Sequence, residues 1–184
     1  LQKARRFRIV QFHCIFLFLL ALISCQISAS GSSATARTIL KSTNMHGGFA
    51  VHIEPSSADL TRGLHNNQTI LVHSLFSDAS RYSSFRNSAL QEGIYGLVSG
   101  DIIKDYKRLP YSDNQVNLIV VDNWTKAKEL GLQPRELYRI AAPQGNVAIR
   151  TDNNGGVAGI AQSLDNAGFE SPQVQSIDNG NIIL

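Results

Sequence analysis

The stretch Val116-Asn117-Leu118-Ile119-Val120-Val121, with Asp122 directly after it, decides the fold class of this chain. It is an almost unbroken apolar run rich in β-branched residues, which is typical of a strand buried on both faces of a sheet. A helix is predicted to begin at Pro134, because proline suits the first turn of a helix, and to end at about Ala142, before Pro143. A buried strand with a helix beyond it is the repeating unit of a parallel α/β sheet.

The same alternation of strands and helices continues on both sides of this strand. Four further strands are predicted from apolar runs, over Phe49–Ile53, Thr69–His73, Leu97–Ile102 and Asn146–Arg150. Three further helices are predicted to begin near Ser57, Asp78 and Val157. The sequence therefore predicts an α/β fold, a layered sandwich with a mostly parallel sheet.

The last part of the chain has a different pattern. Two short runs, Val174–Ile177 and Asn181–Leu184, are joined by Asp178-Asn179-Gly180, a turn sequence that favours an antiparallel hairpin. The chain stops within the second run, which indicates a domain truncated at its C-terminus. We therefore expect residues 47–184 to form one truncated domain, preceded by a tether and a short helix over residues 31–46.

The first 30 residues are predicted to be a leader. Basic residues precede a ten-residue apolar run, Cys14–Ile23, which is shorter than the roughly 20 residues of a membrane span. Small residues follow it, an order that is typical of a secretory signal peptide. We expect export, either with cleavage after Ser28-Ala29-Ser30 or as a lipoprotein with a lipid on Cys25, in a periplasmic or membrane-anchored location. An uncleaved membrane anchor is the remaining alternative.

Composition excludes several classes of function. The chain has a formal charge of +3, but without the four basic residues of the leader it carries 13 basic and 14 acidic residues, a net charge of −1. No basic footprint for nucleic acid is left. Both cysteines, Cys14 and Cys25, lie in the leader, and the histidines show no spacing typical of metal ligands. We therefore expect no metal site and no nucleic-acid partner.

Ligands of an open parallel sheet bind beyond the carboxyl ends of its strands, near the point where the strand order reverses. The candidate residues are therefore those that directly follow each predicted strand. They are Glu54 to Asp59 after the first, Leu75 to Asp78 after the second, Asp101 at the end of the third and Asp122 to Trp124 after the fourth.

Three segments resemble the class I S-adenosylmethionine-dependent methyltransferases. The resemblance is closest to a bacterial subgroup in which a methyltransferase type 11-like domain precedes a quinone-type β-propeller. The segments are Gly47–Ile53, Leu109–Leu118 and Glu136–Gly145. The resemblance implies a Rossmann-like three-layer sandwich, S-adenosylmethionine as cofactor, an unknown methyl acceptor and a C-terminal propeller beyond Leu184.

The chain departs from the family where the cofactor binds. The family follows its first strand with a Gly-x-Gly-x-Gly loop, and Glu54, Ser56 and Ala58 stand at the three glycine positions. The family also ends its second strand with an acid that holds the ribose, where this chain has Phe76, with Asp78 two residues on as a substitute. The glycine loop is therefore degenerate.

By the same resemblance, Asp101 takes the place of the acid near the adenine, which completes the cofactor-binding set. The substrate-binding candidates are Asp122, Asn123 and Trp124, and no catalytic residue is assigned. Each of these residues also has a structural alternative to ligand binding. Glu54 is then a solvated loop acid, Asp78 caps a helix, Asp101 ends a strand at the surface and Trp124 packs against the core. Two functions follow, a methyltransferase-like domain and, alternatively, a non-catalytic exported scaffold or binding domain.

Overall fold

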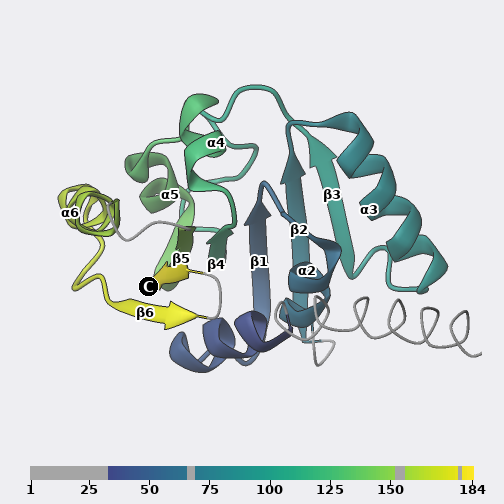
Figure 1. The fold of residues 1–184 in the computed structure, drawn as a ribbon, viewed down its shortest axis with the longest axis horizontal. Helices are drawn as coiled ribbons and strands as arrows, with labels where there is room; N and C mark the ends of the chain where they lie inside the picture. The colour runs from purple at the N-terminus through teal and green to yellow at the C-terminus, as the bar shows by residue number, and fades with distance from the viewer. Residues whose placement is uncertain (1–32, 66–68, 152–155, 178–179) are drawn as a thin grey trace, which may run out of the picture.

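The computed structural model describes residues 33–65, 69–151, 156–177 and 180–184. In this part of the chain, seven strands form one sheet in the order β3-β2-β1-β4-β5-β7-β6 (Figure 1). All neighbouring strands pair in parallel except β7, which runs antiparallel to both β5 and β6. The strands are β1 (Gly48–Ile53), β2 (Ile70–Phe76), β3 (Val98–Ile102), β4 (Val116–Val121), β5 (Ala141–Thr151), β6 (Val174–Ile177) and β7 (Gly180–Ile183).

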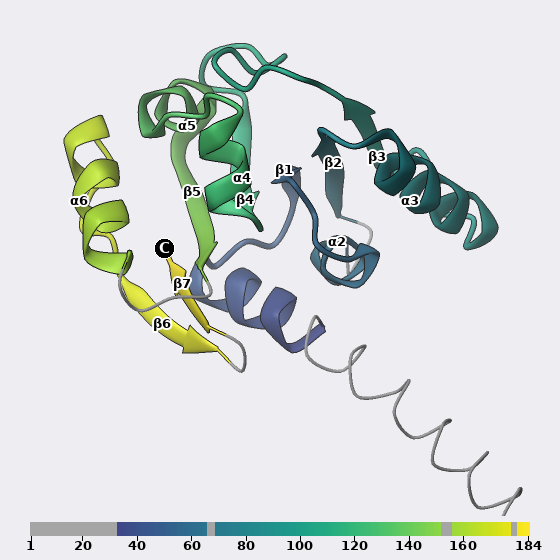
Figure 2. The same ribbon diagram turned by 45° about the horizontal axis from the view of Figure 1, so that its top comes forward.

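Helices cover both faces of the sheet, as the alternating pattern predicts (Figures 1 and 2). One face packs against residues 33–42, which are helical, and against α2 and α3, through side chains such as Ile39, Leu60 and Phe85. The other face packs against α4, α5 and α6, through Ala127, Leu137 and Leu164 among others. The helices are α2 (Ala58–Leu64), α3 (Ala79–Gln91), α4 (Trp124–Glu129), α5 (Pro134–Ile140) and α6 (Val157–Ala167).

The predicted Rossmann-like three-layer sandwich and C-terminal hairpin are confirmed. The predicted strand over residues 116–121 matches β4, whose last four residues are buried. Gly168 ends α6 in a left-handed conformation with φ 112°. The order of the sheet reverses between β1 and β4, so the switch point lies where the loops after these two strands meet.

Two local predictions were wrong. The helix from Pro134 ends at Ile140, and Pro143 lies within β5 instead of beyond the helix end. β5 begins at Ala141, and its register against β4 shifts between Val116 and Leu118, so the residues around Pro143 form an irregularity in the strand. Proline is tolerated there because a bulged residue has no ladder hydrogen bond to make. In addition, α4 follows β4, and no helix was predicted at this place.

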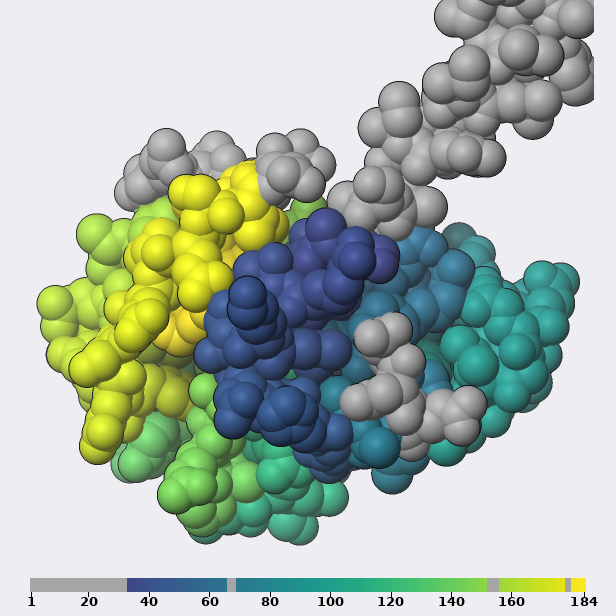
Figure 3. Space-filling view, turned by 90° about the horizontal axis from the view of Figure 1, so that it is seen from below, coloured from purple at the N-terminus to yellow at the C-terminus, as the bar shows by residue number. Residues whose placement is uncertain are grey.

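The helical residues 33–42 and the C-terminal hairpin lie side by side at the amino-terminal edge of the sheet (Figure 3). The hydroxyl of Ser42 donates a hydrogen bond of 2.9 Å to Oε1 of Gln175 in β6. No helix in the described ranges is long and apolar enough to cross a membrane. The predicted leader, with Cys25, and the turn residues 178 and 179 lie outside the described residues.

Candidate functional site

The first residue after β1, Glu54, has a fully buried side chain at the switch point of the sheet. Its Oε1 accepts hydrogen bonds of 2.7 Å from the backbone N–H of Ser77 and 2.7 Å from the hydroxyl of Tyr106. Its Oε2 lies 2.9 Å from Nζ of Lys126 and 3.5 Å from Nη1 of Arg81. We call these five residues the Glu54 site. Glu54 and Ser77 directly follow β1 and β2, and the other three come from the loop after β3, from α4 and from α3, so one carboxylate joins five segments.

The environment of Glu54 corrects the interpretation of this residue as a solvated loop acid. Burial raises the pKa of Glu54, but hydrogen bonds from Tyr106, Lys126 and Ser77 outweigh burial and leave the pKa below its ordinary value. The carboxylate is therefore ionised at neutral pH. Burial and the hydrogen bond to Glu54 raise the pKa of Tyr106, so its hydroxyl remains a donor.

The backbone of Glu54 adopts φ 51°, in the left-handed region. This conformation costs an L residue roughly 1–2 kcal/mol and costs glycine little. Gln144 in β5 likewise has a positive φ of 62°. At both positions the backbone has a conformation that favours glycine, and the residue carries a long polar side chain.

A second buried acid, Asp122, lies next to the Glu54 site at the carboxyl end of β4. Its Oδ2 accepts from the backbone N–H of Ser56 at 2.6 Å and also from the Ser56 hydroxyl, while its Oδ1 accepts from Nη1 of Arg150 at 2.6 Å. Nε2 of His52 lies 3.6 Å from Oδ2, and Nδ1 of His52 contacts the hydroxyl of Thr61 at 2.8 Å. Burial raises the pKa of Asp122, but His52, Ser56 and Arg150 together hold it well below its ordinary range.

The other predicted site residues lie around these two acids without joining them. Asp78 caps α3 by accepting from the N–H of Arg81 at 2.8 Å, and Asn123 caps α4 by accepting from the N–H of Lys126 at 3.0 Å. Ala58 is the first residue of α2. Trp124 begins α4 and packs partly buried against the core.

Asp101 lies apart from both acids. Its side chain is 69% exposed, and Oδ2 is 3.4 Å from Nε2 of His73. Nδ1 of His73 in turn contacts the hydroxyl of Tyr111 at 2.7 Å. Burial lowers the pKa of His73, although Asp101 opposes this. The structure therefore brings Ser56 and Asp122 into direct contact, while Asp101 belongs to a separate pair at the surface.

A small hollow of about 210 Å³ borders the loop after β1. Pro55, Ser56, Phe76 and Arg81 are among the residues that line it. Nη2 of Arg81 donates a hydrogen bond to the carbonyl of Pro55 and so ties α3 to this loop. Pockets that hold drug-sized ligands have volumes of about 300–1,000 Å³, so the space left between these elements is small.

Sequence reasoning missed four residues that hold the two acids: Arg81, Tyr106, Lys126 and Arg150. Lys126 could have been placed from the sequence. Asparagine is one of the residues preferred at the N-cap of a helix, so Asn123 would have predicted a helix over residues 124–129 that includes Lys126. No sequence pattern points to Tyr106 or Arg81, since their contacts with Glu54 depend on the tertiary fold. No group of metal-ligating side chains is found among the described residues.

No family model matches the chain, and no curated protein matches it in sequence. Solved structures do match its fold. One is a protein of Methanococcus maripaludis described as an S-adenosyl-L-methionine-dependent methyltransferase, with a TM-score of 0.71 and 17% identity over 89% of this chain and 88% of that one. A SAM-dependent methyltransferase from Aquifex aeolicus matches with a TM-score of 0.61 and 15% identity, over 80% of this chain and 87% of its own.

The chain has the class I methyltransferase fold. A third neighbour with this fold is the [4+2]-cyclase SpnF, with a TM-score of 0.63 and 14% identity over 78% of this chain and 59% of that one. At such low identities the likeness concerns the fold alone. Because the same methyltransferase fold carries a cyclase, the function of this chain has to be argued from its own side chains.

Proposed function

We propose that this chain is an exported domain of the methyltransferase fold that does not transfer methyl groups and serves as a scaffold or binding domain. By resemblance to its structural neighbours, S-adenosylmethionine is the cofactor of the fold. The proposal rests on one observation: the side chain of Glu54, at the first glycine position, is buried at the carboxyl end of β1 and is held there by Ser77, Tyr106 and Lys126.

The residues at this site do not fit the cofactor. Glu54 reaches the N–H of Ser77, the residue after Phe76, and the resemblance places the acid that holds the ribose at the position of Phe76. Ser77 and Tyr106 donate hydrogen bonds to Oε1 of Glu54, and Lys126 and Arg81 form ion pairs with Oε2. The charge of the carboxylate is therefore neutralised by cations of the chain itself, and its side chain occupies space that glycine would leave open.

Further support comes from the neighbouring elements. The hydrogen bond from Arg81 to the carbonyl of Pro55 closes the loop after β1 against α3. Ser56, at the second glycine position, has its N–H and hydroxyl bound to Asp122. The backbone donor of Ser56 is therefore not available to a ligand. S-adenosylmethionine enters only if several of these contacts break together.

Export is the second part of the proposal, and the leader pattern supports it, with a periplasmic or lipoprotein location. A domain that has its cofactor site filled by its own side chains suits a compartment without S-adenosylmethionine. A C-terminal propeller, as in the family subgroup that the sequence resembles, is the partner we propose for the scaffold. The alternative is a working methyltransferase for an unidentified acceptor, which the neighbours' fold supports.

The test is calorimetric titration of S-adenosylmethionine and S-adenosylhomocysteine into the purified chain and into Glu54→Gly. We expect no saturable heat from the unaltered chain at millimolar ligand and measurable binding by the glycine variant, because the variant removes the carboxylate and keeps the backbone conformation. Asn44→Gly is the matched control. Asn44 also has a left-handed φ of 49° but precedes β1, whereas Glu54 follows the other end of this strand.

Micromolar binding by the unaltered chain, a standard free energy of about −8 kcal/mol, would overturn the proposal and support the methyltransferase alternative. If Glu54→Gly is folded by circular dichroism and still binds neither ligand, the carboxylate is not what closes the site, and the role proposed for Glu54 is wrong.

A further inference from the structure

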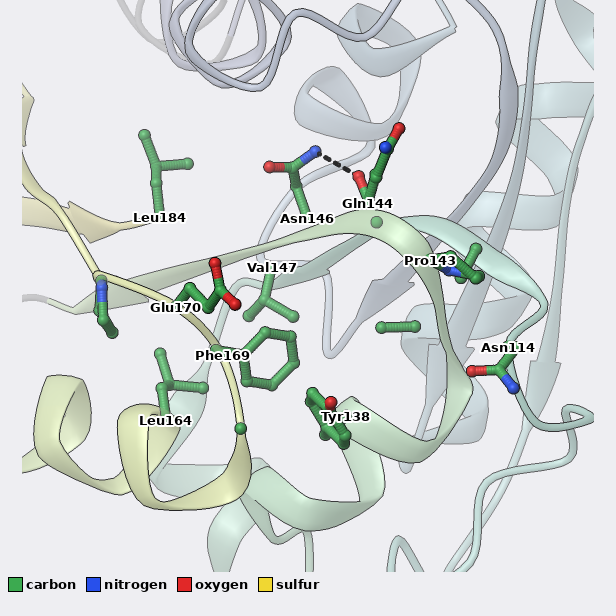
Figure 4. Close-up of a pocket in the computed structure, with 15 residues that line it drawn as sticks. Asn114, Tyr138, Pro143, Gln144, Asn146, Val147, Leu164, Phe169, Glu170 and Leu184 are labelled. Carbon is green, nitrogen blue, oxygen red and sulfur yellow. Dashed lines mark hydrogen bonds between the residues drawn. The ribbon is translucent and has the colours of Figure 1, made fainter.

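A second hollow lies at the amino-terminal edge of the sheet, at the opposite end of β5 from Arg150 and Asp122. Its volume is about 560 Å³, within the range of roughly 300–1,000 Å³ that small-molecule sites span. The start of β5, the end of α5 and the end of α6 surround it, together with the loop that leads to β6 (Figure 4). We call it the β5 pocket. No residue of the Glu54 site lines it.

Aromatic and aliphatic side chains form one wall of the β5 pocket. The rings of Tyr138 and Phe169 meet edge to face, with centroids 5.3 Å apart and planes at 89°. Val147 and Leu164 are buried beside them. Tyr138 is 48% exposed, so part of its ring is open to a ligand. In Figure 4 the side chains of Tyr138, Val147 and Phe169 point toward the same space.

Among the described residues that line the β5 pocket, Glu170 carries the only charged side chain. Figure 4 shows Glu170 among the side chains that line the pocket, together with Val147 and Phe169. It has no hydrogen-bond or ion-pair partner within the described part of the chain. Glu170 therefore differs from Glu54 and Asp122, whose oxygens are bound to cations of the protein itself.

Left-handed backbone is concentrated around this pocket. Five described non-glycine residues have positive φ, and three of them lie at the pocket: Asn114 (58°), Gln144 (62°) and Ser171 (50°). Asn114 and Gln144 line the pocket, and Ser171 follows Glu170. Such residues persist only where the surroundings hold them, and they are frequent at ligand-binding sites.

Two glycines fix the shape of the wall. A Cβ on Gly145 would lie 2.8 Å from the carbonyl oxygens of Ala142 and Val116, so the irregular start of β5 is tightly packed. A Cβ on Gly168 would lie 2.8 Å from the ring of Tyr138. Because neither residue has a side chain, the irregular start of β5 packs closely at Gly145 and the ring of Tyr138 packs against Gly168. The pocket is therefore formed without a ligand.

We propose that the β5 pocket binds a small organic cation, an amine that carries an aromatic body. The ammonium group pairs with the free carboxylate of Glu170, and the body packs against Tyr138 and Phe169. Aromatic faces attract a cation, and the attraction adds to a charge-assisted hydrogen bond. The same carboxylate repels an anionic ligand. This site is independent of the Glu54 site and of whether S-adenosylmethionine binds there.

The probe is benzylamine, titrated at pH 7 into the ¹⁵N-labelled chain of residues 1–184 and followed by amide chemical shifts. We expect saturable shifts at Gly168, Phe169 and Glu170, with millimolar affinity. Glu170→Gln weakens binding about tenfold, and benzyl alcohol, which lacks the charge, binds about tenfold more weakly than benzylamine. Asp165→Asn is the matched control, because it removes the same charge from an exposed position of α6 that does not line the pocket.

Three results would each overturn the proposal. The first is the absence of saturable shifts in a chain whose spectrum is that of a folded protein. The second is equal weakening by Glu170→Gln and Asp165→Asn, which would indicate a general charge effect. The third is equal binding of benzylamine and benzyl alcohol. Tyr138→Ala, at a half-exposed residue, gives an independent check with an expected loss of about tenfold.

Discussion

Replacing Glu54 with glycine and with alanine separates what its side chain and its backbone contribute to stability. Both variants lose the carboxylate, so both lose the contacts with Lys126 and Tyr106. They differ in the backbone, because φ at this position is 51°. We expect Glu54→Gly to be more stable than Glu54→Ala, the reverse of the usual order of these two residues.

The magnitude follows from the geometry. Breaking a buried ion pair costs about 3–5 kcal/mol, but the side chains of Arg81 and Lys126 are 35% and 33% exposed and can turn to water. A loss of about 2–3 kcal/mol is therefore expected for both variants. Alanine in the left-handed region costs roughly 1–2 kcal/mol, and the extra freedom of glycine in the unfolded chain offsets about half of this. The expected difference is about 1 kcal/mol.

The measurement is urea unfolding at pH 7, followed by circular dichroism. The matched control is the same pair of substitutions at Ser83, an exposed residue inside α3, where alanine should be the more stable by about 1 kcal/mol. If glycine and alanine keep the ordinary order at Glu54 as well, the left-handed backbone does not govern this position. If both Glu54 variants are as stable as the unaltered chain, the buried carboxylate contributes nothing to the fold.

Two more predictions concern pH and packing. The fold lowers the pKa values of Glu54 and Asp122 from 4.5 and 3.8. The free energy of unfolding is therefore complete above about pH 4.5 and falls as the pH drops through and below these values, by up to about 1.4 kcal/mol per pH unit for each group. In urea unfolding across this range, Glu54→Gln should show a shallower loss of stability with falling pH, and a slope equal to that of the unaltered chain would contradict the assignment. Gly168→Ala should lower the free energy of unfolding by about 2 kcal/mol, through strain at φ 112° and contact with Tyr138. Gly93→Ala, at φ 69° with open space around it, should lose only about 1 kcal/mol, and equal losses would rule out the contact.

Most of the fold could be predicted because the central strands are buried on both faces. β4 is a mostly apolar run whose ends coincide with the ends of the strand. Asp78 caps the start of α3 and Gly168 ends α6 in a left-handed conformation, and both effects depend only on residues within one turn of the helix. α4 was missed because its six residues carry only one buried side chain, Ala127, so no apolar period stands out. Pro143 was misjudged because a bulge in β5 depends on pairing with β4, which no local pattern shows.

The candidate site shows where sequence reasoning stops. The positions of Glu54 and Asp122 could be predicted, because acids that follow buried strands collect at one edge of the sheet. Their environment could not be predicted. Whether a loop carboxylate is solvated or buried depends on cations that come from other elements, and Lys126 lies 72 residues further along the chain than Glu54. A spacing pattern cannot contain such a contact.

The buried carboxylate also explains how the fold can be stable without a ligand at its switch point. A ligand that binds only the native state adds stability that depends on its concentration, about 2.7 kcal/mol at a hundred times its Kd. Glu54 links β1, α3 and α4 through Arg81 and Lys126, and it is always present because it belongs to the chain. Its contribution is of similar size, and it outweighs the roughly 1–2 kcal/mol that the left-handed backbone costs. A chain with glycine at this position would have relaxed backbone geometry, but Arg81 and Lys126 would turn to water and the link between these three elements would be lost.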